Sequence, residues 1–386
     1  MKILQIISHY VPAYHYGGAL HVAHALSRAL IQQGHEVRVV TTNLESPRRT
    51  LPIAAGAAVQ QDGVPVYYEP VQLSRYWGFS LSLARRTWQQ AAWADICLFH
   101  FHYQFASLVG GWACRQLRKP FVIFSHGSLN RFGISRRSRW LKQLYLRLLE
   151  GSNFRRALFV AYHSQEELES SLQPSRSLVV PNGIDPRSFS RLPEPGSFRR
   201  KFALPTRKTM LLYLGRIDAG KGLDLLIPAF ARLVSVHPNL QLVLAGGDER
   251  GYTAAVRSMI LYHGLQDSVT MTGLISGEDK LGALQDAELY VLPSRSEGLS
   301  IAMLEAMYMG LPVVVSDRVG LWKQVRARGC GAVFALGEDG LEQALHTVIL
   351  DPQRAEMGRR GRALVEAEYT WDTIGKRLVE RIRERI

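Results

Sequence analysis

The sequence predicts an α/β protein of two domains, each built on a mostly parallel β-sheet covered by helices. Short apolar runs alternate with amphipathic stretches along most of the 386 residues, which is the pattern of strands joined by crossover helices. At about 150 residues per domain, this length corresponds to two large or three small domains. Apolar residues make up 47% of the chain and charged residues 21%, a composition that excludes a disordered or coiled-coil protein.

The first predicted βαβ unit opens the chain. Ile3 to Ile7 is expected as a strand, and residues 18–33 carry apolar side chains at helical spacing. Gly34 follows at the end of this helix, just before a strand at 36–41. The further strands expected in the first half lie at 64–68, 95–99, 121–125, 157–161 and 178–180.

A break in the pattern marks the predicted domain boundary. Residues 181–205 are rich in Pro, Gly and Ser and lack apolar periodicity. The second half then restarts the alternation, and residues 340–385 look mainly helical. Its strands are expected at 209–214, 240–245, 268–272, 288–292, 312–315 and 331–334.

Basic residues are concentrated in the first half. The net charge is +14, and residues 1–180 hold 20 basic and 9 acidic side chains, which predicts an anionic ligand, surface or polymer. The three cysteines, with no C-x-x-C spacing, suggest neither a disulfide framework nor a zinc site. No apolar run reaches about 18 residues. We therefore expect a cytoplasmic protein, either free or peripheral at the inner face of the plasma membrane.

One candidate phosphate-binding loop lies at Gly215–Gly222, after a predicted strand. It has the spacing G-x-x-x-x-G-K, but Gly222 stands where a nucleotide-hydrolysing P-loop has the Ser or Thr that holds magnesium, which disfavours an ATPase or GTPase. Arg216 and Lys221 place two cations beside a helix N-terminus, an arrangement suited to a diphosphate. The alternative is a tight turn with two solvated basic residues.

The second motif follows the strand at 288–292. Glu297 precedes a predicted helix whose first amides are Gly298 to Ser300, and Glu305 lies two turns further on. Successive helical residues turn by about 100°, so the two carboxylates lie within about 80° of each other and can border one cleft. Free amides suit a phosphate, and carboxylates accept hydrogen bonds from sugar hydroxyls. The alternative is an acid near a helix N-terminus and an acid on a solvated face.

These two motifs carry a family resemblance that covers nearly the whole chain. Glu297-Gly298-x6-Glu305, with Gly215-Arg216-x4-Lys221-Gly222 before it, resembles the nucleotide-sugar site of the group 1 glycosyltransferases, the retaining family 4 enzymes of GT-B fold. The family's glycine-rich loop, His-Gly segment and interdomain crossing are resembled by Gly17-Gly18, Ser125–Leu129 and Val180–Asp185.

The resemblance implies two Rossmann-like domains facing across a cleft. Residues 1–183 would form the acceptor-side domain and residues 184–368 the nucleotide-sugar-binding domain. Residues 369–386 would form a last helix that crosses back to the first domain.

The resemblance also assigns roles to residues. Arg216 and Lys221 would bind the donor diphosphate and neutralise the leaving group, which together with the lack of any D-x-D triplet implies that no metal or other cofactor is needed. His126 and Glu297 would join them as catalytic residues, and His102 and Asn182 would lie on the acceptor side. The donor-binding residues implied are Gly17, Gly18, Arg216, Lys221, Glu297, Gly298, Leu299, Ser300 and Glu305.

The activity implied is retaining transfer of a hexose-type sugar from a UDP- or GDP-sugar to a glycan or lipid-linked acceptor, in bacterial surface polysaccharide biosynthesis. The alternative is a sugar-nucleotide epimerase or hydrolase on the same fold. A nucleic-acid partner is not expected, because no nucleic-acid-binding module is recognisable. A nicotinamide-dependent dehydrogenase is disfavoured because no G-x-G-x-x-G follows the first strand.

A strongly basic segment lies at residues 131–156. It holds eight basic residues and one acid, Glu150, interleaved with apolar and aromatic side chains. This pattern predicts a basic amphipathic helix that can rest on an anionic membrane surface. The alternative is a helix packed on the core with a solvated basic face.

Overall fold

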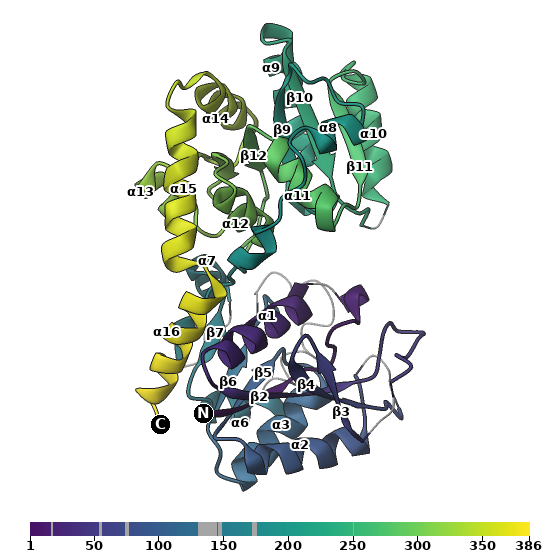
Figure 1. Ribbon diagram of the computed structural model, residues 1–386, viewed down its shortest axis with the longest axis vertical. Coiled ribbons are helices and arrows are strands. Elements are labelled where there is room, and N and C mark those ends of the chain that lie inside the picture. Colours follow the sequence, from purple (N-terminus) through teal and green to yellow (C-terminus); the bar gives the residue numbers. More distant parts are fainter. Residues whose placement is uncertain are drawn as a thin grey trace. The chain divides into compact units, whose positions relative to one another are not determined.

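The computed structural model describes residues 1–16, 18–53, 56–73, 77–129, 145, 149–171, 176–249 and 251–386. It divides the chain into two compact units. The first unit comprises Met1–Asn182 together with Trp371–Ile386, and the second comprises Gly183–Thr370 (Figure 1). Each unit is a layered α/β domain with its own parallel sheet, so the predicted fold class of two such domains is confirmed.

Eight strands form the sheet of the first unit, in the order β3-β4-β2-β1-β5-β6-β7-β8. Their bounds are β1 (Lys2–Ile6), β2 (Glu36–Thr42), β3 (Ala58–Gln61), β4 (Val64–Glu69), β5 (Ile96–His100), β6 (Phe121–Phe124), β7 (Val160–Tyr162) and β8 (Ser177–Val179). All neighbours pair in parallel except β3 and β4. Helices cover both faces, and accordingly β5 is buried along its whole length.

Strand β3 was not predicted from the sequence. Its residues are only exposed or partly buried, because it forms the antiparallel edge of the sheet against β4. Asp62 and Gly63 form the connecting turn, and both have positive φ angles, 48° and 83°. An Asp-Gly pair is typical of such a two-residue hairpin turn, and this was the signal that could have revealed the strand.

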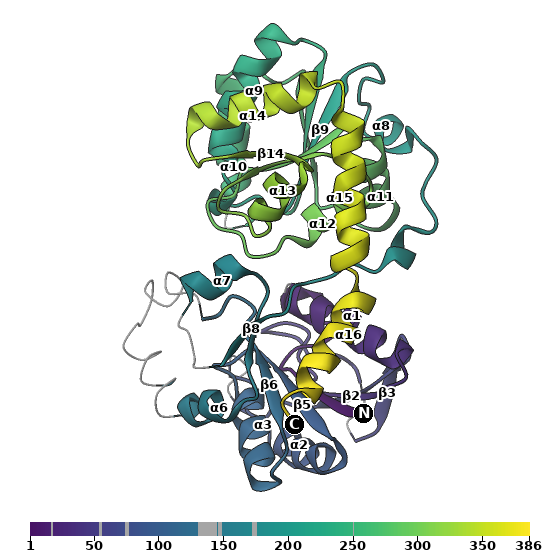
Figure 2. The ribbon, with the colours of Figure 1, turned by 90° about the vertical axis from the view of Figure 1, so that its left-hand side faces the viewer.

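Helices flank the first sheet and include the end of the chain. Their bounds are α1 (Gly18–Gln32), α2 (Leu81–Trp93), α3 (Phe105–Gln116), α6 (Gly151–Arg156), α7 (Gln165–Ser170) and α16 (Trp371–Arg383), with a short 3-10 helix η1 (Tyr14–Tyr16). Helix α16 lies beside α1 (Figures 1 and 2). Gln33 just after α1 donates a hydrogen bond of 2.8 Å to the Asp372 carbonyl, so the C-terminal helix is part of the first unit.

Six strands form the sheet of the second unit, in the order β11-β10-β9-β12-β13-β14, and all neighbours pair in parallel. Their bounds are β9 (Thr209–Leu214), β10 (Leu240–Ala245), β11 (Val269–Gly273), β12 (Leu289–Leu292), β13 (Val313–Ser316) and β14 (Gly331–Phe334). Every strand expected from the sequence in either unit is present, with ends within three residues of the predicted ones.

Helices cover both faces of the second sheet. Their bounds are η3 (Pro186–Phe189), α8 (Ser197–Lys201), η4 (Ala219–Lys221), α9 (Leu223–Val236), α10 (Tyr252–Tyr262), α11 (Gly277–Asp286), α12 (Ile301–Tyr308), α13 (Trp322–Arg328), α14 (Glu338–Leu350) and α15 (Arg354–Glu368). The apolar side chains between these helices and the sheet form one continuous core. The strands β10 and β13 are completely buried, as expected for a parallel sheet covered on both sides.

Candidate functional site

The order of strands in the second unit identifies where a ligand is expected. The chain runs outward from β9 to β11 on one side, then returns to place β12 against the other side of β9. In open α/β sheets, ligands bind at the carboxyl ends of the strands where the order reverses. The loops that border this point are Gly215–Gly222 after β9 and Pro293–Ser300 after β12, the two motifs found in the sequence.

These two loops are held together by direct contacts. Gly222 has a positive φ of 71°, and a Cβ atom there would overlap the carbonyl oxygen of Pro293, so only glycine fits both the turn and the contact. The Arg295 amide donates to the Gly220 carbonyl at 2.9 Å. The Arg295 guanidinium also pairs with both carboxylate oxygens of Asp224 at 2.7 Å. Sequence reasoning missed this last pair, which joins the first turn of α9 to the β12 loop.

Lys221 and Glu297 form an ion pair between the two loops. Their side chains are only 15% and 19% exposed. Glu297 is held in place by its backbone, since its amide donates to the Arg318 carbonyl at 3.0 Å and its carbonyl accepts from Gly320 at 2.9 Å. The structure thus brings together two residues that the sequence predicted for one site, and shows that each is the charge partner of the other.

Arg216 pairs with an acid in the loop that follows β10. Its guanidinium pairs with Glu249, which follows β10, and its side chain remains 66% exposed. The neighbouring backbone is fixed, because the amide of Ile217 donates to the Gly247 carbonyl at 2.8 Å and the carbonyl of Ile217 accepts from Glu249 at 3.1 Å. Sequence reasoning missed Glu249, since an acid in a loop gives no signal of its partner.

Glu305 lies on α12 and pairs with Lys280 of α11 at 2.6 Å. The buried hydroxyl of Tyr290 donates to the Leu214 carbonyl at 3.1 Å. Burial raises the pKa of Tyr290, and the carboxylates of Glu297 and Glu305 raise it further. Both carboxylates therefore act electrostatically on the Tyr290 hydroxyl. Lys280 was not predicted from the sequence, because it belongs to a helix without a recognisable motif.

The predicted start of the helix after Glu297 is wrong by three residues. We expected Gly298 to Ser300 to supply its first amides, but α12 begins at Ile301. Ser300 caps the helix instead, and its hydroxyl accepts from the Met303 amide at 3.3 Å. The backbone at Glu297 cannot be helical, because it pairs with Val319 in a short parallel bridge.

In the first unit, His126 lies in the turn after β6. It is partly exposed and has a positive φ of 45°. One ring nitrogen lies 2.9 Å from His100 and the other 2.9 Å from His163, so both nitrogens already have partners within the protein. His100 is the last residue of β5 and His163 follows β7, the two strands on either side of β6, and neither histidine was predicted.

The other candidates of the first unit are spread over several elements. His102 is buried, and its Nδ1 lies 3.2 Å from the Ser128 hydroxyl. Burial lowers the pKa of His102 to about 3. Asn182 is buried at the end of this unit, and Gly18 begins α1. Gly17 lies outside the described residues.

Within the ranges that the structure describes, no group of three or more His, Cys, Asp or Glu side chains is arranged to hold a metal ion. The three cysteines are buried, and each is a free thiol.

Comparison with known proteins places this geometry in a family. The model described as "Glycosyl transferases group 1" matches residues 196–364, which include both loops of the second unit. The model described as "Glycosyltransferase Family 4" matches residues 16–188. The chain belongs to the group 1, family 4 glycosyltransferases.

Relatives of this glycosyltransferase include an uncharacterized glycosyltransferase of Methanocaldococcus jannaschii, 27% identical over 98% of this chain and 97% of the relative. A GDP-mannose-dependent monoacylated alpha-(1-6)-phosphatidylinositol monomannoside mannosyltransferase of Corynebacterium glutamicum is 30% identical, over 52% of this chain and 54% of its own length. The solved structure of Anabaena HepE in complex with UDP shares the fold, with a TM-score of 0.77, 21% identity and full coverage of both chains.

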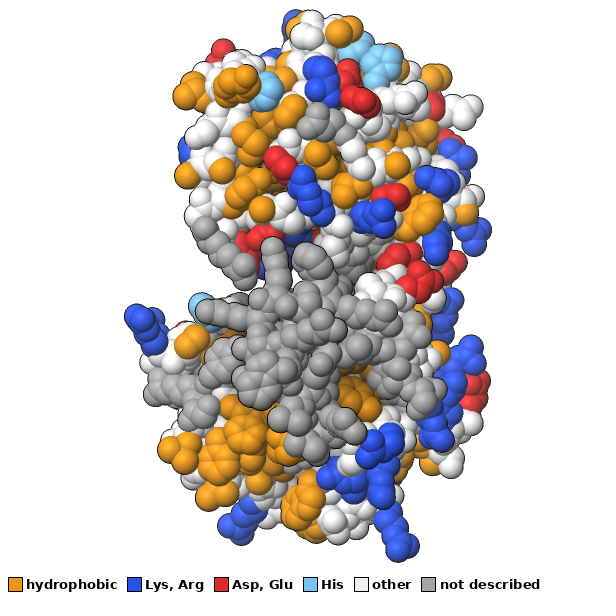
Figure 3. Space-filling model, turned by 180° about the vertical axis from the view of Figure 1, so that it is seen from behind, with side chains coloured by type: hydrophobic (Ala, Val, Ile, Leu, Met, Phe, Trp, Pro, Cys, Tyr) orange, Lys and Arg blue, Asp and Glu red, His pale blue; other side chains and the backbone are white. Residues whose placement is uncertain are grey.

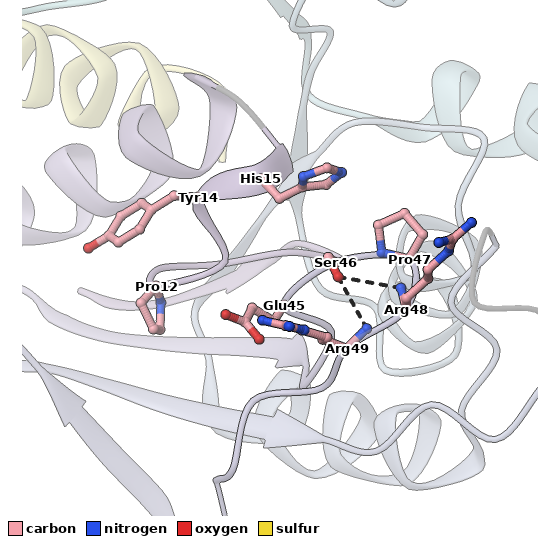
Figure 4. A pocket seen from close by; sticks show the side chains of 8 residues that line it. All are labelled: Pro12, Tyr14, His15, Glu45, Ser46, Pro47, Arg48 and Arg49. Carbon is pink, nitrogen blue, oxygen red and sulfur yellow. Dashed lines mark hydrogen bonds between the residues drawn. The ribbon is translucent and has the colours of Figure 1, made fainter. Parts of the chain in front are cut away.

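The first unit of the glycosyltransferase contains a pocket of about 530 Å³ beside the carboxyl ends of β1 and β2 (Figure 4). Ser46 shapes one wall, since its hydroxyl accepts from the Arg49 amide at 3.1 Å. The pocket offers two arginines, one carboxylate and aromatic side chains. It is lined by Pro12, Tyr14, His15, Glu45, Ser46, Pro47, Arg48 and Arg49.

Most of the basic segment predicted at 131–156 lies outside the described residues. At its end, Arg155 and Arg156 are exposed on α6. Glu150 is buried and accepts from the Ser107 hydroxyl at 2.7 Å, so the one acid of the segment faces the core. Among the described residues, no helix combines the length and the apolar character that crossing a membrane requires.

Proposed function

We propose that this glycosyltransferase transfers a sugar from a UDP- or GDP-sugar to a glycan or lipid-linked acceptor, with retention of the anomeric configuration and without a metal ion. The observation that carries the proposal is the ion pair of Lys221 and Glu297 where the strand order reverses. The HepE structure with UDP and the Corynebacterium relative named for GDP-mannose support a nucleotide-sugar donor.

The cations of the site are set up to exchange partners when the donor binds. Lys221 and Arg216 each pair with a carboxylate. A diphosphate carries more charge than a carboxylate and would draw both cations to itself. The two cations would then stabilise the negative charge that develops on the leaving nucleoside diphosphate.

The same exchange would free Glu297 for the transferred sugar. Glu297, released from Lys221, would accept a hydrogen bond from a hydroxyl of the transferred sugar. Glu305, held by Lys280, would accept from the ribose hydroxyls of the donor. Gly298, Leu299 and Ser300 would complete the donor site between these two acids.

His126, Gly17 and Gly18 are proposed to border the donor sugar from the first unit. A sugar hydroxyl could bond to the His126 ring only by replacing His100 or His163. His102 and Asn182 are proposed on the acceptor side, where both are buried within the first unit.

We place the acceptor in the pocket of the first unit. Arg48 and Arg49 would bind an anionic group of the acceptor, and Tyr14 would offer an aromatic face to a sugar ring. Arg48→Ala and Arg49→Ala should raise the acceptor KM by at least about tenfold, the effect of one charge-assisted hydrogen bond. The KM of the donor should stay unchanged. Equal changes in both KM values would contradict the placement.

The basic segment 131–156 is proposed to touch an anionic membrane surface. Figure 3 shows Lys and Arg side chains close to hydrophobic ones on the drawn face of the first unit. Replacing Arg136, Arg137 and Arg139 with Ser should weaken pelleting with phosphatidylserine vesicles and leave donor hydrolysis intact. Unchanged pelleting would refute this part of the proposal.

The reaction itself is tested with a panel of UDP- and GDP-sugars, each with and without an added glycan or lipid-linked acceptor. Transfer predicts a new glycoside whose anomeric proton coupling matches that of the donor, with equal yield in EDTA. Consumption of the donor without need of an acceptor would favour the epimerase or hydrolase instead. A role in bacterial surface polysaccharide biosynthesis would be supported by a polyprenyl- or lipid-linked glycan as the preferred acceptor.

A further inference from the structure

A row of hydrogen bonds crosses the carboxyl edge of the sheet in the first unit. It begins at Gln5 on β1, passes through His100 on β5, His126 after β6 and His163 after β7, and ends at the Val180 carbonyl after β8. This sequence of strands, β1-β5-β6-β7-β8, is their order in the sheet. We call Gln5, His100, His126 and His163 the histidine chain.

Each link of the histidine chain has the length of a hydrogen bond. Gln5 Oε1 lies 2.8 Å from His100 Nε2, and His100 Nδ1 lies 2.9 Å from His126 Nε2. His126 Nδ1 lies 2.9 Å from His163 Nε2, and His163 Nδ1 lies 3.1 Å from the Val180 carbonyl oxygen. His126 is the partly exposed member, and the other three are buried.

The Val180 carbonyl fixes which nitrogen donates in each hydrogen bond of the histidine chain. A carbonyl only accepts, so His163 Nδ1 must carry the proton that it shares with Val180. In a neutral His163 ring, Nε2 is then bare and must accept from Nδ1 of His126. By the same step, Nε2 of His126 accepts from Nδ1 of His100, and Nε2 of His100 is left bare toward Gln5.

The orientation of the Gln5 side-chain amide therefore determines how many protons the three rings hold. With its oxygen toward His100, both ends of the row accept, and four hydrogen bonds require four ring protons and a charge of +1. With the amide turned, Gln5 Nε2 supplies the fourth proton and the rings stay neutral. In the oxygen-inward orientation, Gln5 Nε2 is buried without a hydrogen-bond partner among the described residues.

The surroundings favour the neutral form at neutral pH. Burial lowers the pKa of His100 to about 3, and burial followed by the neighbouring rings lowers that of His126. Glu167 of α7 accepts from the His163 amide at 2.8 Å, and its carboxylate only partly offsets the lowering of the His163 pKa by burial. His102 also faces His126, and burial keeps it neutral too.

We propose that the histidine chain is one titrating unit that holds three ring protons when the Gln5 amide donates and four when it accepts, so that Gln5 turns whenever the unit takes up a proton. The proton is taken from hydronium of the solvent, so one O–H bond breaks for the one N–H bond that forms, and His126 keeps both of its ring hydrogen bonds. The final N–H forms at His100 Nε2, and Gln5 Oε1 accepts it. Gln5, His100 and His163 are thereby positioning residues that fix the tautomer of His126.

The first test reads the tautomers directly. In the full chain labelled with ¹⁵N-histidine, long-range ¹H–¹⁵N spectra distinguish a protonated Nδ1 from a protonated Nε2. At neutral pH we expect His100, His126 and His163 to carry their protons on Nδ1, with assignments from single His→Gln variants. A protonated Nε2 on any of the three rings would overturn the proposal, and a merely structural role for the rings does not require this common tautomer.

The second test follows Gln5 as the pH is lowered. The side-chain NH₂ signals of Gln5, assigned by their loss in Gln5→Leu, should shift at the same pH as the three rings. The side chain of Gln33, bonded to the Asp372 carbonyl, is the control that should not follow them. Rings that titrate at separate pH values, or an unchanged Gln5, would overturn the proposal. If the protein unfolds before the rings titrate, the tautomers at neutral pH decide the question.

Discussion

Lys221 and Glu297, 76 residues apart in the sequence, pair with each other at the carboxyl edge of the second sheet. The pair exists because β9 and β12 are neighbours in the sheet, so the loops that follow them meet. It joins a cation suited to a phosphate with an acid suited to a sugar hydroxyl. A nucleotide sugar bound as proposed would therefore have to compete with an interaction that the chain already makes.

This competition predicts an unusual result for Glu297→Gln. Removing the carboxylate charge frees Lys221 for the diphosphate, so UDP or GDP should bind to the variant at least as tightly as to the natural chain. Sugar transfer should nevertheless fall by about 100-fold or more, because the variant lacks the charged acceptor for the sugar hydroxyl. Titration calorimetry and an initial-rate assay measure the two effects. Weaker nucleotide binding in Glu297→Gln would refute the exchange of partners.

The contact of Gly222 with Pro293 predicts a stability difference between two glycine substitutions. Gly222→Ala and Gly264→Ala both place a side chain at positive φ, 71° and 65°. A Cβ atom at Gly264 would meet no atom within 4 Å, whereas at Gly222 it would overlap the Pro293 carbonyl. Gly264→Ala should lower the free energy of unfolding by about 1 kcal/mol. Gly222→Ala should cost about 2 kcal/mol more, as expected for overpacking.

Urea unfolding measures both glycine variants. Gly222→Ala should also weaken binding of the nucleoside diphosphate, since the strain falls on the loop that carries Lys221. Equal losses of stability in the two variants would mean that the close approach to Pro293 does not hold the loops together.

Buried neutral histidines predict how stability depends on pH. Burial lowers the pKa of His9 to about 4, and those of His100 and His102 to about 3. Histidines of the unfolded chain have a pKa of about 6.5. Below that pH the unfolded chain binds protons that the folded chain does not, so the free energy of unfolding falls as the pH falls from about 6.5 to about 4.

Each such histidine contributes about 1.4 kcal/mol per pH unit within this window. His102→Asn removes one of them and retains a group that can bond to Ser128. Its free energy of unfolding should change less steeply with pH than that of the natural chain, by about one proton. Parallel curves from urea unfolding at several pH values would show that His102 does not carry this dependence.

Much of the fold followed from local patterns. The buried strands β10 and β13 are continuous apolar runs, which the sequence shows directly. Strand β3 was missed because an exposed edge strand has no such run. The start of α12 was misplaced because the backbone of Glu297 is bound to the loop after β13, a contact between distant segments that no local signal reports.

Site residues that belong to a recognisable sequence motif could be predicted. Residues that matter only because they pair with a motif residue could not. Lys221 and Glu297 stand in recognisable motifs. Lys280 and Glu249 are ordinary surface residues in sequence, and only the packing of α11 and the β10 loop brings them to Glu305 and Arg216. Gln5 likewise reads as one polar residue within an apolar strand, and its role depends on the order of strands in the sheet.

The most direct test of the account compares two lysine substitutions in a titration with UDP and GDP. Lys221→Met removes the cation at the carboxyl end of β9, and Lys208→Met removes a partly buried lysine just before the amino end of the same strand. Lys221→Met should lose at least about 100-fold in affinity for the preferred nucleotide, equivalent to about 2.7 kcal/mol, while Lys208→Met should bind it as the natural chain does. Equal affinities in the two variants would contradict a donor diphosphate bound by Lys221.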